Sequence, residues 1–117
     1  MTTLFHITPR KNIKSIKMLG IKPAYTKGLY CGDSRKSVVW LTDNPNYILQ
    51  TQAGDVWIKK NDPVVLKVEC DGLDVKPYIS YVTNKVAPHE FYFEGTIKQS
   101  FEVELSIAHE SKNEQTN

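Results

Sequence analysis

The chain has 117 residues, of which 40% are hydrophobic and 24% are charged, and its formal net charge is +2. This length and composition predict one globular domain with a single core and leave no room for a second domain. The charge is too weak to imply nucleic-acid binding by itself, and it is compatible with a small anionic ligand. Because no stretch resembles a membrane span or a signal peptide, we expect a soluble protein that stays in the cytoplasm.

The cysteines and histidines do not have the spacing of a metal site. Cys31 and Cys70 are far apart, and His6, His89 and His109 are scattered along the chain. We interpret each cysteine as a buried or unreactive thiol, although the two can still pair in space. A metal-dependent hydrolase is therefore the least favoured class of enzyme, and we expect no bound metal.

The first elements are a short strand and an amphipathic helix. Residues 3–7 form a β-type run, and Thr8 followed by Pro9 is a typical helix start, with threonine as the cap and proline in the first turn. Gly20 is placed to end this helix. The apolar stripe that would face the core consists of Ile13, Ile16 and Leu19.

A long loop and a second helix follow. Residues 22–36 are rich in Pro, Gly, Tyr, Asp and Ser and have no sustained period, which predicts an ordered loop of a length that is often functional. Residues 37–42, SVVWLT, predict a buried strand. Asn44 as a cap and Pro45 at the first position then predict a helix that ends at Gly54.

The second half of the chain reads mainly as strands, which predicts an α+β domain over residues 1–108. It has no helices between its later strands, so a doubly wound sheet is excluded. Residues 109–117 are polar and are expected to be a disordered tail. The expected segments are a short strand at 56–60, a strand at 63–70, a turn with a short extended piece at 71–78, and strands at 89–95 and 99–107.

Two polar residues in strands are candidates for a site. His6 ends the first strand close to a helix N-terminus, where backbone amides attract anions. Glu90 stands near the start of a later strand, and Glu94 shares its face by the period of two, which makes Glu94 its main rival. His89 is expected to point to the opposite face, in a structural or exposed position. Each of these residues taken alone is more often structural than functional.

Three motifs in series resemble the ADP-ribosyltransferase superfamily over residues 4–105. The segment LFHITPRKNIKSIKMLGIKP resembles its opening strand and helix, and VVWLTD at 38–43 resembles its next strand. The segment TNKVAPHEFYFEG resembles RNA 2′-phosphotransferases of the same superfamily and places Glu90 at its acidic position. The superfamily also contains polymerase-like enzymes and DNA-modifying toxins. The chain is too short for the extra lobe of the phosphotransferases, which argues against removal of an RNA 2′-phosphate.

This resemblance implies a split β-sheet with two short helices near the N-terminus, with NAD as the substrate in the cleft. Glu90 is then the catalytic acid, because cleavage of the nicotinamide–ribose bond builds positive charge that a carboxylate stabilises. His6 holds a ribose hydroxyl, and Thr8 adds a second hydroxyl contact. Trp40, Tyr47 or Tyr30 stacks on the nicotinamide. The residues implied to bind NAD are His6, Ile7, Thr8, Trp40, Thr42, Tyr47 and Tyr30.

Three functions stay open on this reading. The favoured one is a mono-ADP-ribosyltransferase of the toxin or phage host-modifier kind, which transfers ADP-ribose to a protein or a nucleic acid. The second is an enzyme with the same site that transfers ADP-ribose to water or to a small molecule. The third is a catalytically silent domain that binds a nucleotide or a partner protein. The sequence does not name the acceptor, an inhibitor or an antitoxin partner, and we expect no membrane partner.

Overall fold

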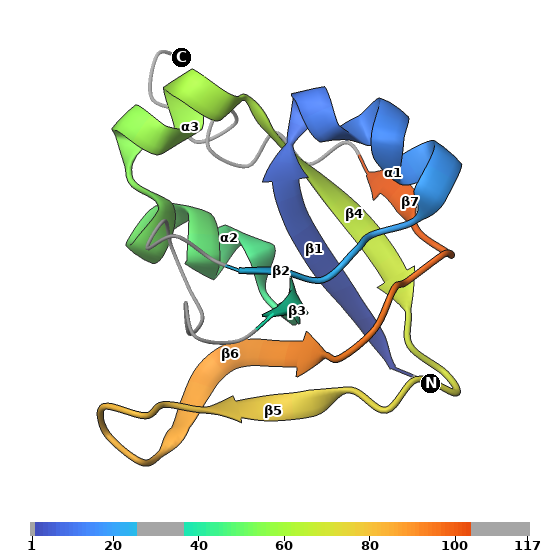
Figure 1. Ribbon diagram of the computed structural model, residues 1–117. Helices are drawn as coiled ribbons and strands as arrows, with labels where there is room; N and C mark the ends of the chain where they lie inside the picture. The colour runs from blue at the N-terminus through green and yellow to red at the C-terminus, as the bar shows by residue number, and fades with distance from the viewer. Residues whose placement is uncertain (1, 26–36, 104–117) are drawn as a thin grey trace.

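A computed structural model describes residues 2–25 and 37–103 of the chain. Short helices and short strands alternate through the first half, and strands dominate the second half (Figure 1). The elements are β1 (Thr3–Pro9), η1 (Arg10–Asn12), α1 (Ile13–Leu19), β2 (Ala24–Tyr25), β3 (Ser37–Leu41), α2 (Pro45–Ile48), η2 (Leu49–Ala53), α3 (Asp55–Asn61), β4 (Pro63–Glu69), β5 (Lys76–Ile79), β6 (Val86–Phe93) and β7 (Phe101–Val103). The α+β class expected from the sequence is confirmed.

The described strands form two antiparallel sheets. One has the order β1-β4-β7, and the other has the order β2-β3-β6-β5. In the first sheet β1 and β4 pair along their whole lengths, from Thr3 opposite Glu69 to Pro9 opposite Pro63. Pro63 and Pro9 lie at the ends of this ladder, where the missing amide hydrogen costs least.

The core has three clusters of buried side chains, and alternation along β1 separates the first from the second. Leu4 packs with Leu66 of β4 and with Val39 and Leu41 of β3, so this first cluster joins the two sheets. Ile7 points to the other face, where residues of α2, η2 and α3 cover the sheet. Because side chains of a strand alternate between faces, these two clusters lie on opposite sides of β1. A third cluster is built from β3, β5 and β6.

The first helix differs from its prediction at its start and in its buried stripe. The strand runs through Pro9, which is extended at ψ 141°, and the chain then passes through the 3₁₀ turn η1 before α1. Thr8 does not cap the helix; its Oγ1 accepts a hydrogen bond from Asn12 Nδ2 at 3.0 Å. Leu19, expected in the buried stripe, is 50% exposed. Gly20 ends the helix as predicted, with φ at +85°.

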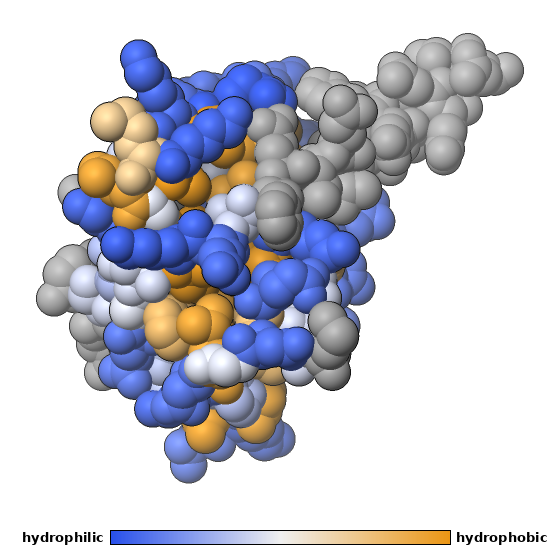
Figure 2. Space-filling model, turned by 90° about the vertical axis from the view of Figure 1, so that its right-hand side faces the viewer, coloured by the Kyte–Doolittle hydropathy of each residue, from blue (hydrophilic) through white to orange (hydrophobic). Residues whose placement is uncertain are grey.

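The buried stripe of α1 is shallow. Ile13 and Ile16 are half-buried against the first core cluster. A pocket of about 160 Å³ lies beside them and is lined also by Leu66, Lys17 and Lys98, so part of each isoleucine faces open space. Figure 2 shows this side of the molecule, where apolar and charged surface alternate.

The second helical region ends at Gly54 as predicted, but an unpredicted third helix follows it. Asn44 caps α2 as predicted, since its Oδ1 accepts from the Tyr47 amide at 3.0 Å, and Pro45 stands in the first turn. The turn η2 then leads to Gly54, after which a third helix begins. The strand predicted at 56–60 is wrong, because these residues belong to α3. Trp57 is buried in this helix, whereas its neighbour Val56 is 82% exposed. A short apolar run fits either a strand or a helix, and here the tertiary packing selects the helix.

The remaining predictions fall partly outside the described residues. Within the loop predicted at 22–36, the structure describes the short strand β2, and the rest of the loop, with Cys31, lies outside the description. The expected tail at 109–117 and the last strand beyond Val103 also lie outside it. Cys70 is a buried free thiol, and burial raises its pKa. In the described part of the chain, no helix is long and apolar enough to cross a membrane.

Candidate functional site

The two sheets meet at one point, where β1 touches the end of β3. The Phe5 amide donates to the Thr42 carbonyl and the Thr42 amide donates to the Phe5 carbonyl, both at 2.8 Å. No other bridge joins β1 to β3 in the described residues, because β1 continues along β4 while β3 continues along β6. β1 and β3 are thus hydrogen-bonded through their backbones at this bridge, and the first core cluster packs between the two sheets.

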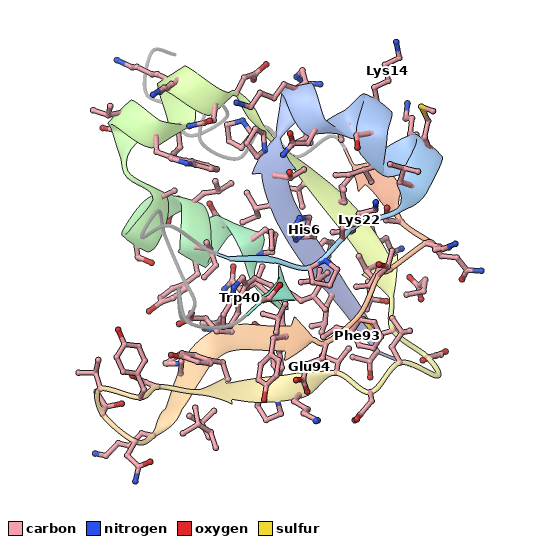
Figure 3. All side chains as sticks on the ribbon, in the orientation of Figure 1. His6, Lys14, Lys22, Trp40, Phe93 and Glu94 are labelled. Carbon is pink, nitrogen blue, oxygen red and sulfur yellow. The ribbon has the colours of Figure 1, made fainter. Side chains whose placement is uncertain are left out.

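His6 lies at this junction of the sheets, next to Phe5, the bridging residue of β1. Its Nδ1 is 2.8 Å from the carbonyl oxygen of Trp40 on β3 (Figure 3). A carbonyl only accepts, so Nδ1 carries the hydrogen and Nε2 of the neutral ring is the acceptor. Burial lowers the pKa of His6, against the opposing effect of the hydrogen bond to Trp40. The ring is thus held neutral, with one nitrogen able to accept a hydrogen bond from a ligand hydroxyl.

Glu90 lies on β6, next to β3. The pairing of Trp40 with Tyr92 and of Leu41 with Phe91, continued by one residue, sets Glu90 opposite Thr42. Since Phe91 packs against the first core cluster, Glu90 faces the other side of the sheet together with Trp40 and Tyr92. Glu90 is only 9% exposed, which is unusual for a glutamate and gives it a fixed position.

Glu94, the predicted rival, has a different environment. It lies just beyond the end of β6 and is exposed. Its Oε1 is 3.2 Å from Lys76 Nζ on β5, and this contact raises the pKa of the lysine. Figure 3 shows Glu94 at the arrowhead end of β6, below His6 and Trp40 in this view. The structure therefore separates the two acids, and Glu90 is the one near the junction of the sheets.

Trp40 and Tyr47, the predicted stacking residues, are presented differently. Trp40 is 6% exposed, and its ring meets Tyr78 edge-on at 5.0 Å and Tyr92 at 5.9 Å. Its Nε1 is buried and has no hydrogen-bond partner among the described residues. Tyr47 on α2 is half-buried, and its ring lies 4.7 Å from the ring of His89. Tyr47 is thus the more accessible of the two aromatic rings.

The other described residues predicted to bind NAD do not share one face of the sheets. Thr42 is buried at the bridge between the sheets, and Thr8 is buried two residues beyond His6. The Ile7 side chain packs in the second core cluster, on the opposite face of β1 from His6 and Thr8. Tyr30 lies outside the described residues.

His89 was not expected to take part in a site. It has φ at +64°, a left-handed conformation that histidine adopts more readily than most residues. The pairing of β5 with β6 is irregular around it, because Pro77 opposes Phe91 whereas Ile79 opposes Val86. Its Nδ1 is 2.6 Å from Asp43 Oδ1. The strand was expected to start at residue 89, but β6 begins at Val86 and carries this bulge, which redirects the side chain.

The arrangement therefore places a neutral histidine, a buried glutamate and a histidine–aspartate pair around the end of β3. In the described residues, no three His, Cys, Asp or Glu side chains gather as a metal site would require. No protein-family model, curated protein or solved structure matches the chain.

Proposed function

We propose that this chain is a mono-ADP-ribosyltransferase that cleaves NAD and transfers ADP-ribose to a macromolecular acceptor. The observation that carries the proposal is the junction of the sheets: the Phe5–Thr42 bridge brings the strand of His6 to the end of β3, and Glu90 is next to Phe91, which pairs with Leu41 at that end. β1 and β6 therefore flank the same end of β3, and His6 and Glu90 are the polar groups on them that we assign to the ribose.

The chemistry of NAD cleavage matches what these side chains offer. As the bond between nicotinamide and ribose breaks, positive charge develops on the sugar, and a carboxylate at a fixed position stabilises it. Glu90 is such a carboxylate, and it can also accept a hydrogen bond from a ribose hydroxyl. His6 Nε2 accepts from a second hydroxyl, because its other nitrogen is engaged by the Trp40 carbonyl. These contacts hold the sugar as it reacts.

An aromatic ring is expected to support the nicotinamide. Tyr47 is the better placed candidate because it is half-buried on α2 and its ring contacts His89, the residue before Glu90. Trp40 contributes differently: its buried ring anchors the third core cluster, and its indole N–H is left for an acceptor atom. A planar carboxamide offers such an acceptor in its carbonyl oxygen.

The test is turnover and binding of NAD by the wild type and by Glu90→Gln. We expect both proteins to bind NAD in calorimetry, and we expect nicotinamide release to fall by about 10²–10³-fold in the variant, as for the loss of one electrostatic contact to a transition state. Glu94→Gln is the matched control, because it removes the charge of an exposed acid on the same segment and should leave release unchanged.

Three outcomes would overturn the proposal or change the assignment. If neither wild type nor variant binds NAD, the chain is a silent domain of this fold and a partner protein should be sought. If Glu94→Gln loses release while Glu90→Gln keeps it, the acid has been assigned to the wrong residue. Release without any transferred ADP-ribose on cellular protein or nucleic acid would indicate a glycohydrolase.

A further inference from the structure

The pair formed by His89 and Asp43 is a second chemical group beside Glu90 that NAD cleavage does not use. The side chains of His89 and Asp43 are 36% and 46% exposed, and their closest atoms are 2.6 Å apart. Asp43 lies in a bend just after β3 and His89 precedes Glu90 on β6, so their contact joins the two strands where the ladder of β3 with β6 ends. The pair therefore closes the end of this ladder, one residue beyond Glu90.

The pair has the orientation that a general base needs. An aspartate oxygen accepts, so His89 Nδ1 donates to Asp43, and Nε2 on the far side of the ring carries the free lone pair. A carboxylate in this position holds the tautomer and stabilises the imidazolium that forms when Nε2 takes a proton. The Tyr47 ring, 4.7 Å away, restricts the imidazole from one side.

The backbone at His89 is also unusual for a residue with only a surface role. Its φ of +64° lies in the left-handed region, and such conformations cost free energy and cluster at functional sites. The bulge turns His89 away from plain strand alternation and toward the turn that carries Asp43. An ordinary strand would have placed His89 and Glu90 on opposite faces.

We propose that His89, oriented by Asp43, is the general base that activates the acceptor, and that the acceptor group is a hydroxyl. This inference rests on the proposed function. A hydroxyl must lose its proton as it attacks, whereas a carboxylate or another anion needs no base. The acceptor oxygen forms a bond to C1 of the ribose, the bond from C1 to nicotinamide breaks, and neutral nicotinamide leaves with the electron pair. The hydroxyl proton passes to His89 Nε2.

The experiment compares a protonated nucleophile with an anionic one. The full chain is incubated with NAD in methanol-containing buffer or in azide-containing buffer, and the methyl and azido derivatives of ADP-ribose are quantified with released nicotinamide. The decisive variant is His89→Asn. Asparagine tolerates the left-handed backbone, and its amide can replace Nδ1 as the donor to Asp43, but it has no counterpart to Nε2.

We expect His89→Asn to lower methyl transfer by about 10²–10⁴-fold, the usual contribution of a general base. Transfer to azide should be unchanged, because azide has no proton to lose. Asp43→Asn should also lower methyl transfer selectively, since the imidazole loses the partner that orients it. Asp74→Asn is the matched control: Asp74 is an exposed aspartate whose charged neighbour is Lys76, and its substitution should change neither product.

Each other result has a definite meaning. If His89→Asn lowers methyl and azide transfer equally, His89 only supports the structure and the inference is wrong. If it lowers neither, the base lies elsewhere and the inference is also wrong. If the wild type releases no nicotinamide with either nucleophile, the proposed function itself fails, which is a different result from a selective failure of the variant.

Discussion

Acidification is expected to destabilise the folded chain through His6. Burial of the ring lowers the pKa of His6, and the hydrogen bond from Nδ1 to the Trp40 carbonyl opposes this effect without cancelling it. In the unfolded chain the residue titrates near the ordinary histidine pKa of about 6.5. The unfolded state therefore takes up a proton at a higher pH than the folded state does.

The sign and size of the effect follow from this difference. Above about pH 6.5 the ring is neutral in both states, and the stability contributed by the neutral buried form is fully present. As the pH falls below this value, protonation favours the unfolded chain, and the free energy of unfolding drops by up to about 1.4 kcal/mol per pH unit. Between pH 7 and pH 5 the loss is at most about 2 kcal/mol.

Urea denaturation of the wild type and of His6→Asn at the two pH values isolates this contribution. Asparagine does not titrate, and its side-chain amide can donate to the Trp40 carbonyl in place of Nδ1. The variant should be less stable at pH 7 but should lose less stability on acidification. Contributions from the carboxylates are common to both proteins and cancel in the comparison.

An equal loss of stability in the two proteins would refute the reasoning, because His6 would then have the same proton affinity in both states. A larger loss in the variant would reverse the sign and contradict a lowered pKa. The slope of the urea transition should be the same in both proteins, which ensures that the comparison concerns stability and not the extent of unfolding.

Two further pairs of variants test the packing, both by urea denaturation. Ile48→Ala should lower the free energy of unfolding by about 2–5 kcal/mol, because Ile48 is fully buried. Ile16→Ala should lower it less, since Ile16 is half-buried beside a pocket. Equal losses would show that the helix α1 packs more tightly than described. Gly20→Ala should cost more than Gly54→Ala. Both glycines have positive φ, which alone costs about 1–3 kcal/mol, but only at Gly20 would a Cβ lie 2.7 Å from a backbone oxygen, that of Ile97; a smaller cost at Gly20 would contradict this contact.

The elements with local signals were predictable from the sequence. The strand around His6 and the strand that contains Trp40 are β-branched and apolar runs, and both appear where expected. The start of α2 was also predictable. Asn44 accepts a hydrogen bond from a backbone amide of the first turn, and Pro45 lacks an amide hydrogen that would need a partner there, so both act independently of the rest of the fold. Such signals depend on the residues themselves and on their immediate neighbours.

The candidate site was predictable only in part. His6 and Glu90 stood out through motif order, but nothing local indicated that β1 and β3 would meet at the Phe5–Thr42 bridge and set the two residues on nearby strands. The helix over 56–60 was missed for a related reason: a five-residue apolar run fits either period, and the burial of Trp57 in the second cluster selects the helix.

The sequence by itself determined the α+β class, the strands that contain His6 and Trp40, and the helix start at Asn44. Only the tertiary structure decided the pairing of His89 with Asp43, which are 46 residues apart, and the left-handed backbone that turns His89 toward its partner. The physical reason is the range of the interactions. Caps and periodicity act within a few residues, whereas a bulge and a cross-strand hydrogen bond depend on the register of strands that are distant in the chain.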